Sequence, residues 1–190
     1  GERLLFSDST FTIYRGERVA LLGKNGSGKS TLLRIILDEL LPDEGKLSLG
    51  ASIKIGYLPQ NITFEQSNQR VLAFVKEFLP QEQKARQRLA HFGFYSEDVE
   101  RRLKELSGGE RVRLYLLQLF QRQINLLILD EPTNHLDIYA REEIEELLSE
   151  YTGTLLAVTH DRYFLQKNFN GLLVIEEQEI KKETMDFLHN

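Results

Sequence analysis

The sequence predicts an α/β domain, because apolar segments typical of strands alternate along the chain with segments of helical spacing. Four segments are apolar over most of their length, as buried strands are: residues 18–23, 126–130, 154–160 and 171–177. Three longer segments carry apolar residues at helical spacing: residues 29–41, 110–120 and 139–151. With 190 residues, of which 41% are hydrophobic, the chain can bury the core of one domain of ordinary size.

Shorter patterns predict the remaining strands and the end of the first helix. Three segments alternate between apolar and polar residues, as half-exposed strands do: residues 10–14, 46–50 and 52–58. The helix over 29–41 is expected to end there because Pro42 and Gly45 follow it.

The middle of the chain carries only helical patterns. These cover residues 71–79, 82–92 and 96–106, and Ser96 is the expected N-cap of the last. We therefore expect an α/β core built from residues 1–60 and 107–190, with a small helical insert over residues 61–106.

The composition excludes several classes of protein. There is no cysteine, which excludes disulfides and cysteine-built metal sites and fits a reducing compartment. No apolar stretch approaches the roughly 20 residues that span a membrane, and the N-terminus is no signal peptide. The net charge of −5 argues against a broad electrostatic grip on nucleic acid by this domain alone. We expect a cytoplasmic protein without membrane insertion.

The segment "GKNGSGKS" carries the first chemical signal. It matches G-x-x-x-x-G-K-[ST] and lies between a predicted buried strand and a predicted helix. Glycines let backbone N–H groups turn toward phosphate oxygens, and the helix N-terminus adds its positive dipole. Lys29 would reach the β- and γ-phosphates of a nucleotide, and the Ser30 hydroxyl would ligate Mg²⁺. The residues predicted to bind ATP are Gly23, Asn25, Gly26, Ser27, Gly28, Lys29, Ser30 and Thr31.

Two adjacent acids lie at the end of a predicted strand: Asp130 ends "LLILD", and Glu131 begins the next segment, "EPTNHLD". In P-loop NTPases a carboxylate at this position holds Mg²⁺, commonly through water, and Asp130 is placed for that role. Glu131 would then polarise the water that attacks the γ-phosphate. The alternative is a solvated acid that merely precedes Pro132.

Two further segments carry candidate nucleotide contacts. In "LSGGE" Ser107 and Glu110 form a capping box, yet two glycines are poor helix formers, and at a helix N-terminus they suit an anion. One domain cannot wrap both this helix start and the P-loop around one phosphate chain, so a second copy is expected to face the first. His160 ends a predicted strand, where it is either an ordinary histidine or a hydrogen-bond donor to a γ-phosphate.

Together these segments resemble the ordered motif set of ATP-binding-cassette (ABC) ATPase domains. The resemblance rests on "GKNGSGKS", "YLPQ", "LSGGE", "LLILDE", "LD" at Leu136–Asp137 and "TH" at His160. It implies a P-loop NTPase core with an antiparallel β subdomain and a small helical subdomain. It also implies two cassettes packed head to tail around two ATP molecules.

The same resemblance assigns further roles within that dimer. Gln60 would contact Mg²⁺ and the attacking water, and Asp137 would cross the dimer interface. Four residues would bind the ATP of the partner cassette in trans: Ser107, Gly108, Gly109 and Glu110.

Two segments resemble one group within that family. "EPTNHLD", with Asn134 and His135, and "THDRYFL" are similar to segments of ABC-F proteins, which carry two cassettes in one chain and act on ribosomes. This implies that the chain is part of a longer parent protein whose partner is the ribosome, including its rRNA. The parent would act in translation or in antibiotic resistance by ribosome protection. The chain would be a fragment of that parent, most like its second cassette.

The adenine-stacking aromatic of the family would precede a glycine that resembles Gly1. It would therefore lie outside the chain. Phe6 is the nearest aromatic left, and we expect it to pack in the sheet.

Two other functions are open on the sequence. The chain could be the ATPase subunit of an ABC membrane transporter. It could also be a nucleotide-gated binding module that rarely hydrolyses ATP, as in structural-maintenance proteins, although those carry long coiled coils where this chain has a short insert.

Overall fold

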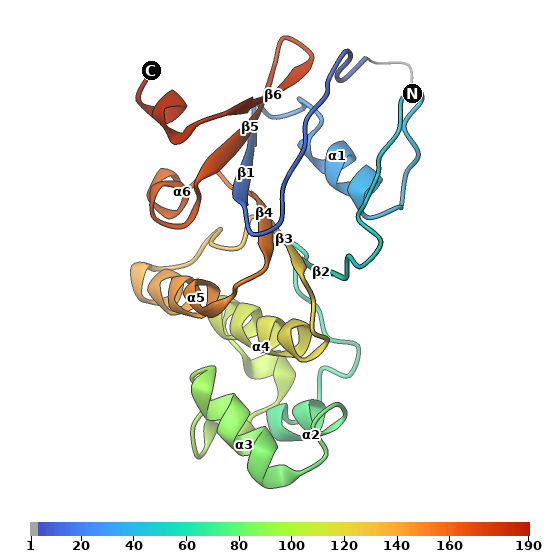
Figure 1. Cartoon of the computed structure of the whole chain (residues 1–190). Coiled ribbons are helices and arrows are strands. Elements are labelled where there is room, and N and C mark those ends of the chain that lie inside the picture. Colours follow the sequence, from blue (N-terminus) through green and yellow to red (C-terminus); the bar gives the residue numbers. More distant parts are fainter. Residues whose placement is uncertain (1–3) are drawn as a thin grey trace.

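The computed structural model describes residues 4–190, which form a six-stranded sheet with helices on both faces (Figure 1). The strand order is β2–β3–β4–β1–β5–β6, and all neighbours are parallel except β5 and β6. The strands are β1 (Arg18–Gly23), β2 (Ile55–Leu58), β3 (Leu126–Asp130), β4 (Thr154–Val158), β5 (Gly171–Glu176) and β6 (Glu179–Glu183). The predicted α/β class is confirmed.

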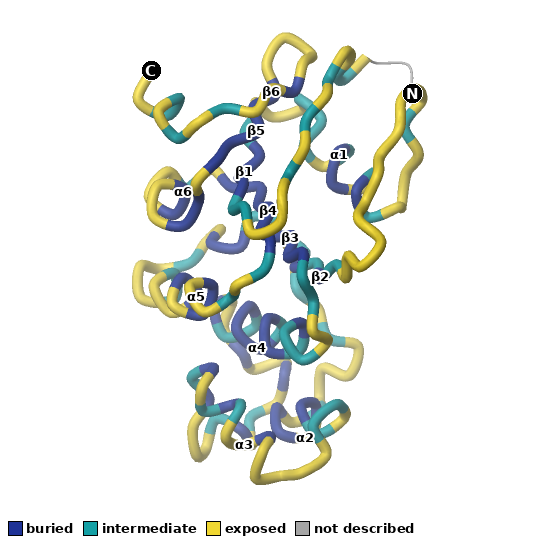
Figure 2. The backbone as a smooth tube through the Cα atoms, viewed as in Figure 1, coloured by how far each residue is buried: buried dark blue, intermediate teal, exposed yellow. Residues whose placement is uncertain are grey.

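Helices cover both faces because the central strands are apolar on both sides. Alternate residues of β3 enter different apolar clusters: Leu127 and Leu129 face one, and Leu126 and Ile128 face the other. A parallel sheet buried on both faces needs such strands. Figure 2 shows these strands as the most buried part of the chain, while most of the segment between α1 and β2 is exposed.

The helices divide between the two clusters. Helix α1 packs on one face, and α4, α5 and α6 pack on the other, with α2 and α3 beyond α4 (Figure 1). The helices are α1 (Lys29–Ile36), α2 (Val71–Lys76), α3 (Glu82–His91), α4 (Gly108–Gln121), α5 (Ile138–Glu150) and α6 (Arg162–Asn168). Three 3₁₀ turns cover Asp98–Glu100, Leu103–Glu105 and Met185–His189.

The prediction of a helix over residues 96–106 is wrong. Two 3₁₀ turns take its place, and Ser96 adopts φ 29° instead of capping a helix. The cause is pairing with the segment before α2: the Val71 N–H donates to the Arg101 carbonyl, and the Leu103 N–H donates to the Gln69 carbonyl, both at 2.9 Å. Backbone groups used in these contacts are not available to a helix.

The strands predicted over residues 10–14 and 46–50 are also absent, and the one over 52–58 shortens to β2. The N-terminal segment instead contacts β6 largely through side chains: the Ile180 N–H donates to Ser9 Oγ at 2.9 Å, and Lys182 Nζ donates to the Thr12 carbonyl at 2.8 Å. Within residues 4–190 the only antiparallel ladder joins β5 and β6. The expected antiparallel subdomain is therefore reduced to that pair.

Helix α1 ends at Ile36, earlier than predicted. The Glu39 N–H donates to the Arg34 carbonyl at 2.8 Å, and the Asp38 N–H donates to the Ile35 carbonyl at 3.1 Å. With Asp38 at φ 61°, these bonds form a Schellman motif, which terminates a helix through a left-handed residue. Pro42 and Gly45 come too late to set this end.

The left-handed conformation of Asp38 gives a test of this helix end. Asp38→Gly should raise the free energy of unfolding by about 0.5–1 kcal/mol, because glycine adopts positive φ without a steric cost. Asp38→Ala should lower it, because alanine meets that cost without the local hydrogen bonds that help aspartate. Urea unfolding of both variants measures the difference, and equal stability of the two would contradict the assignment.

Candidate functional site

The P-loop (Gly23–Ser30) joins the end of β1 to the start of α1. Gly26 and Gly28 have φ of 80° and 109°, values that side chains rarely adopt. A Cβ on Gly28 would lie 3.0 Å from the ring of Phe6, which packs against the sheet cluster as expected. These glycines therefore allow both the turn of the loop and the close packing beside it.

Lys29 is folded back over the loop. Its Nζ donates to the Gly23 carbonyl and, at 3.3 Å, to the Lys24 carbonyl. Burial lowers the pKa of Lys29, and the charge of Glu131 opposes that change. The Lys29 ammonium group thus lies next to the backbone of the P-loop, where it is placed to bind an anion.

Asp130 ends β3 and is bound by a residue of the neighbouring strand. The Tyr57 hydroxyl, from β2, donates to Asp130 Oδ2 at 3.2 Å. Burial raises the pKa of Asp130, and that hydrogen bond opposes the rise. Burial and the nearby Asp130 charge raise the pKa of Tyr57 to about 12, so Tyr57 remains a donor near neutral pH. No local pattern in the sequence indicates this contact.

Glu131 is held in an uncommon backbone conformation next to His160. Its φ is 51°, and its N–H donates to the Val158 carbonyl of β4 at 2.8 Å. Its Oε1 lies 3.1 Å from His160 Nε2, and its side chain is only 15% exposed. Burial, followed by the charge of Asp130, raises the pKa of Glu131, while His160 lowers it. Strained non-glycine residues are concentrated at functional sites.

Asp161 connects the loop that carries His160 to Thr133, in the turn after Glu131, and to Arg141 of α5 through hydrogen bonds. Its Oδ1 accepts from the Phe164 N–H at 3.0 Å and caps α6, while its Oδ2 accepts from Arg141 Nη1 at 2.7 Å and Thr133 Oγ1 at 3.3 Å. Burial by itself would raise the pKa of Asp161, but these partners outweigh burial and lower it. Asp161 was not among the predicted site residues, although an aspartate before an apolar helix is a recognisable N-cap pattern.

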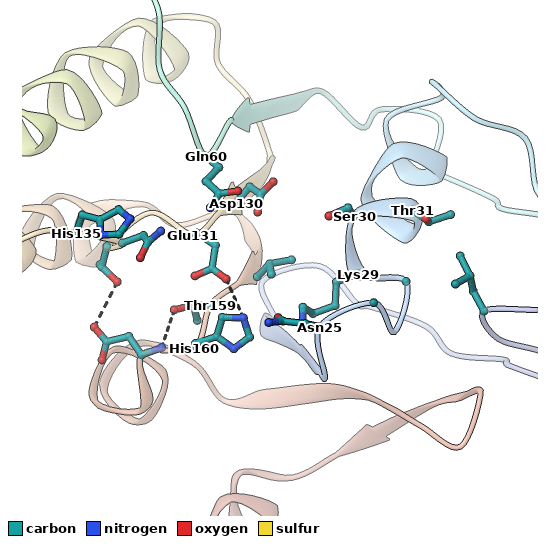
Figure 3. Close-up of a pocket in the computed structure, with 17 residues that line it drawn as sticks. Asn25, Lys29, Ser30, Thr31, Gln60, Asp130, Glu131, His135, Thr159 and His160 are labelled. Atoms are coloured by element: carbon teal, nitrogen blue, oxygen red, sulfur yellow. Dashed lines mark hydrogen bonds and ion pairs between the residues drawn. The ribbon is translucent and has the colours of Figure 1, made fainter. Parts of the chain in front are cut away.

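One cavity of about 720 Å³ is lined by Lys29, Asp130, Glu131, His160 and Asp161 together with other residues (Figure 3). Of the residues predicted for the nucleotide, ten line it: Asn25, Gly26, Gly28, Lys29, Ser30, Thr31, Gln60, Asp130, Glu131 and His160. Gly23 and Ser27 are not among the lining residues. They contact each other instead, so that a Cβ on Gly23 would collide with the Ser27 side chain. Further lining residues include Leu5, Thr133 and His135, the last at φ 61°.

The LSGGE segment (Leu106–Glu110) lies outside this cavity. The predicted capping box is confirmed: the Glu110 N–H donates to Ser107 Oγ at 3.2 Å, and the Ser107 N–H donates to Glu110 Oε1 at 2.9 Å. Arg101 occupies the other oxygen of Glu110 at 2.7 Å. A Cβ on Gly109 would lie 2.8 Å from Ala140 Cβ, so this glycine also permits close packing against α5.

Asp137 caps α5. Its Oδ1 accepts from the Ala140 N–H at 2.8 Å. Because Gly109 lies against Ala140, the N-termini of α4 and α5 are adjacent. Each helix begins at a polar residue that the resemblance places at a dimer contact.

The side chains suit a magnesium ion completed by phosphate. Ser30, Gln60 and Asp130 line the cavity together and offer hydroxyl, amide and carboxylate oxygens, the ligand type that Mg²⁺ prefers. Within residues 4–190 no group of three or more His, Cys, Asp or Glu residues could hold a metal alone. The donor set therefore fits an ion that arrives with its nucleotide.

A glycine-rich loop between a parallel strand and a helix, facing two acids at the end of another strand, defines a P-loop nucleotide-binding domain. The profile of the family described as "ABC transporter" matches residues 6–134. The chain belongs to this family and is an ATP-binding-cassette ATPase domain. In the described part of the chain, no helix is both long and apolar enough to cross a membrane.

Several curated relatives are ABC-F proteins. The chain is 44% identical over 98% of its length to the ribosome protection protein VmlR of Bacillus subtilis, of which it covers 34%. It is 37% identical over 94% of its length to the energy-dependent translational throttle protein EttA of Escherichia coli, of which it covers 33%. The chain thus spans about a third of the length of these relatives.

Solved structures agree on the fold. A chain of an inward-facing ABC transporter of the metal-chelate type superposes with a TM-score of 0.78 at 27% identity, over 94% of this chain and 76% of that one. A dimeric ATP-binding cassette bound to ADP and Pi superposes with a TM-score of 0.72 at 23% identity, over 97% and 93%.

The contacts of Asp161 predict a stability difference between two helix caps. Asp161→Ala removes a cap, an ion pair and a hydroxyl contact, and should cost about 2–3 kcal/mol of unfolding free energy. Asp137→Ala removes only a cap and should cost about 1 kcal/mol, which makes it the matched control.

The pH dependence of the Asp161 effect has a defined sign. Because the folded pKa of Asp161 is lowered, its contribution should be complete above the ordinary value of 3.8 and decline as the pH falls through the folded pKa. Urea unfolding at several pH values measures this contribution. Equal losses of unfolding free energy in the two variants at pH 7 would contradict the role assigned to the Thr133 and Arg141 contacts of Asp161.

Proposed function

We propose that this chain is one cassette of a longer ABC-F protein, in which it binds and hydrolyses MgATP and closes head to tail with a second cassette. The observation that carries this proposal is the division of the candidate residues. Ten of them share one cavity, while the LSGGE segment lies outside it. A chain with these two unlike surfaces is suited to pair with another cassette. The LSGGE segment of each cassette would then face the P-loop cavity of the other.

ATP would first engage the P-loop. Lys29 would exchange its backbone carbonyl partners for the β- and γ-phosphate oxygens, a stronger charge-assisted contact. The N–H groups of the loop and of the start of α1 would bind the remaining phosphate oxygens. Thr31, the next residue of α1, would contact the α/β-phosphates.

Ser30, Gln60 and, through water, Asp130 would hold Mg²⁺. The ion would neutralise charge on the β- and γ-phosphate oxygens when bound. Separating this role from water activation explains why the strand ends on two acids.

Glu131 would act as general base toward the attacking water. Burial raises the pKa of Glu131, which makes its carboxylate a stronger proton acceptor than an exposed glutamate. His160 contacts Glu131 at 3.1 Å and is 58% exposed, so it can turn toward a γ-phosphate without unpacking the core. In this role His160 would donate a hydrogen bond to that phosphate.

The second cassette would complete the site with its own helix start. Ser107 would present its hydroxyl, and Gly108 and Gly109 their backbone N–H groups, to the γ-phosphate across the interface. Asp137 would lie at that interface. The Glu110 carboxylate is held by Ser107 and Arg101, so we assign it the role of shaping this helix start.

The ribosome is the partner that the relatives favour. VmlR and EttA are named for ribosome protection and for translation, and the "EPTNHLD" turn, with His135 in the cavity lining, matches the same group. The choice between these two roles would reside in the parts of the parent protein that this chain does not include.

Lys29→Ala should strongly weaken ATP binding, because the phosphate charge loses its side-chain partner. The loss should exceed about 10-fold in affinity, as expected for a charge-assisted contact. Isothermal titration with ATP measures it, and Lys24→Ala serves as the control because Lys24 is also in the loop but contributes only a carbonyl to Lys29. Unchanged affinity of the Lys29 variant would refute the P-loop assignment.

Glu131→Gln should stop hydrolysis while ATP binding persists, because the variant keeps the shape of the site but lacks the base. In the full-length protein this variant should pellet with ribosomes in the presence of ATP and stay in the supernatant without it. Cosedimentation measures the outcome. A variant that binds ATP but is recovered with membranes instead would favour the transporter subunit.

A further inference from the structure

Tyr57 is outside the cavity lining, yet its hydroxyl lies against a residue at the centre of the site. Strands β2 and β3 pair in parallel, with Tyr57 opposite Ile128 and Leu58 opposite Leu129. The tyrosine side chain extends far enough along β3 to reach the residue that ends it, and its hydroxyl donates to Asp130 Oδ2 at 3.2 Å. The ring itself packs against the apolar cluster that contains Ile128 and Val158.

This hydroxyl is the one hydrogen-bond donor that the described residues give to the Asp130 side chain, which forms no ion pair with any of them. The terminal torsion of an aspartate is broad, so a carboxylate without partners samples many orientations. A donor fixed to Oδ2 selects one of them and leaves Oδ1 for the cavity that Asp130 lines. Packing needs only the ring of Tyr57, whereas orienting the carboxylate needs the hydroxyl.

We propose that Tyr57 is a positioning residue that orients the Asp130 carboxylate for Mg²⁺. This inference rests on the metal role proposed for Asp130. It assigns a specific task to the tyrosine of "YLPQ", three residues before Gln60, so that one short segment supplies both a metal contact and the support for another. Residues that support metal ligands in this way affect metal affinity without touching the metal.

A second tyrosine provides a matched control. The Tyr151 hydroxyl donates to the Thr154 carbonyl at 3.2 Å and is partly buried, as that of Tyr57 is. Thr154 begins β4, at the opposite end of that strand from the cavity. Removing either hydroxyl deletes a partly buried hydrogen bond, and the Tyr151 hydroxyl has a further backbone contact, with Leu127. Only Tyr57→Phe changes a group that faces the nucleotide site.

The experiment measures the Mg²⁺ concentration that gives half-maximal binding of a fluorescent ATP analogue to the chain. Tyr57→Phe should raise that concentration by about 10-fold, at the lower end of the losses seen when metal-supporting contacts are removed. Its affinity for the analogue in EDTA should equal that of the wild type. Tyr151→Phe should leave both quantities unchanged, while it lowers the melting temperature at least as much as Tyr57→Phe does.

Asp130→Asn separates failure of this inference from failure of the proposed function. If Asp130→Asn raises the Mg²⁺ requirement and Tyr57→Phe does not, the metal role of Asp130 holds and the positioning role of Tyr57 is overturned. If neither variant changes the requirement, the metal role of Asp130 falls and this inference falls with it. An equal rise in Tyr57→Phe and Tyr151→Phe would also overturn the inference, because it would show a general loss of stability.

Discussion

The site depends on the parallel register of three central strands. Residue Asp130 of β3 pairs with Val158 of β4, and Val158 pairs with Leu21 of β1, two residues before Gly23. Because parallel strands end at the same edge, this register brings the P-loop, both acids and His160 to one place although they are distant in sequence. A slip by one residue would turn every side chain of a strand to the other face.

Much of this arrangement could be predicted from local patterns. Continuous apolar runs such as Leu126–Leu129 predict strands buried on both faces, and the strand–glycine loop–helix context makes the P-loop specific. The capping box at Ser107 could be predicted because an N-cap and its partner are only three residues apart. The separation of this helix start from the cavity also follows from the sequence, since one phosphate chain cannot reach both.

Other features arise from contacts that a local pattern does not contain. The segment over 96–106 has helical spacing, but pairing with residues 67–71 overrides it. The contact between Tyr57 and Asp130 joins residues 73 positions apart, and it exists only because β2 and β3 are neighbours. The residues 10–14 alternate as a strand does, yet the side chains of Ser9 and Lys182 replace a backbone ladder there. Sequence patterns predict the candidate site residues, and tertiary contacts determine how their side chains are held.

The central claim is that each ATP site is built from two cassettes, and mixing two inactive variants tests it most directly. Lys29→Ala disables the P-loop, and Gly108→Asp places a negative charge at the exposed start of α4, where aspartate suits the helix dipole but repels phosphate. Each variant alone should be inactive. In an equal mixture about half of the dimers contain both variants and one intact site each, so hydrolysis should recover to about a quarter of the wild-type rate. Wild-type activity of Gly108→Asp alone, or no recovery at concentrations where the wild type is active, would contradict the account.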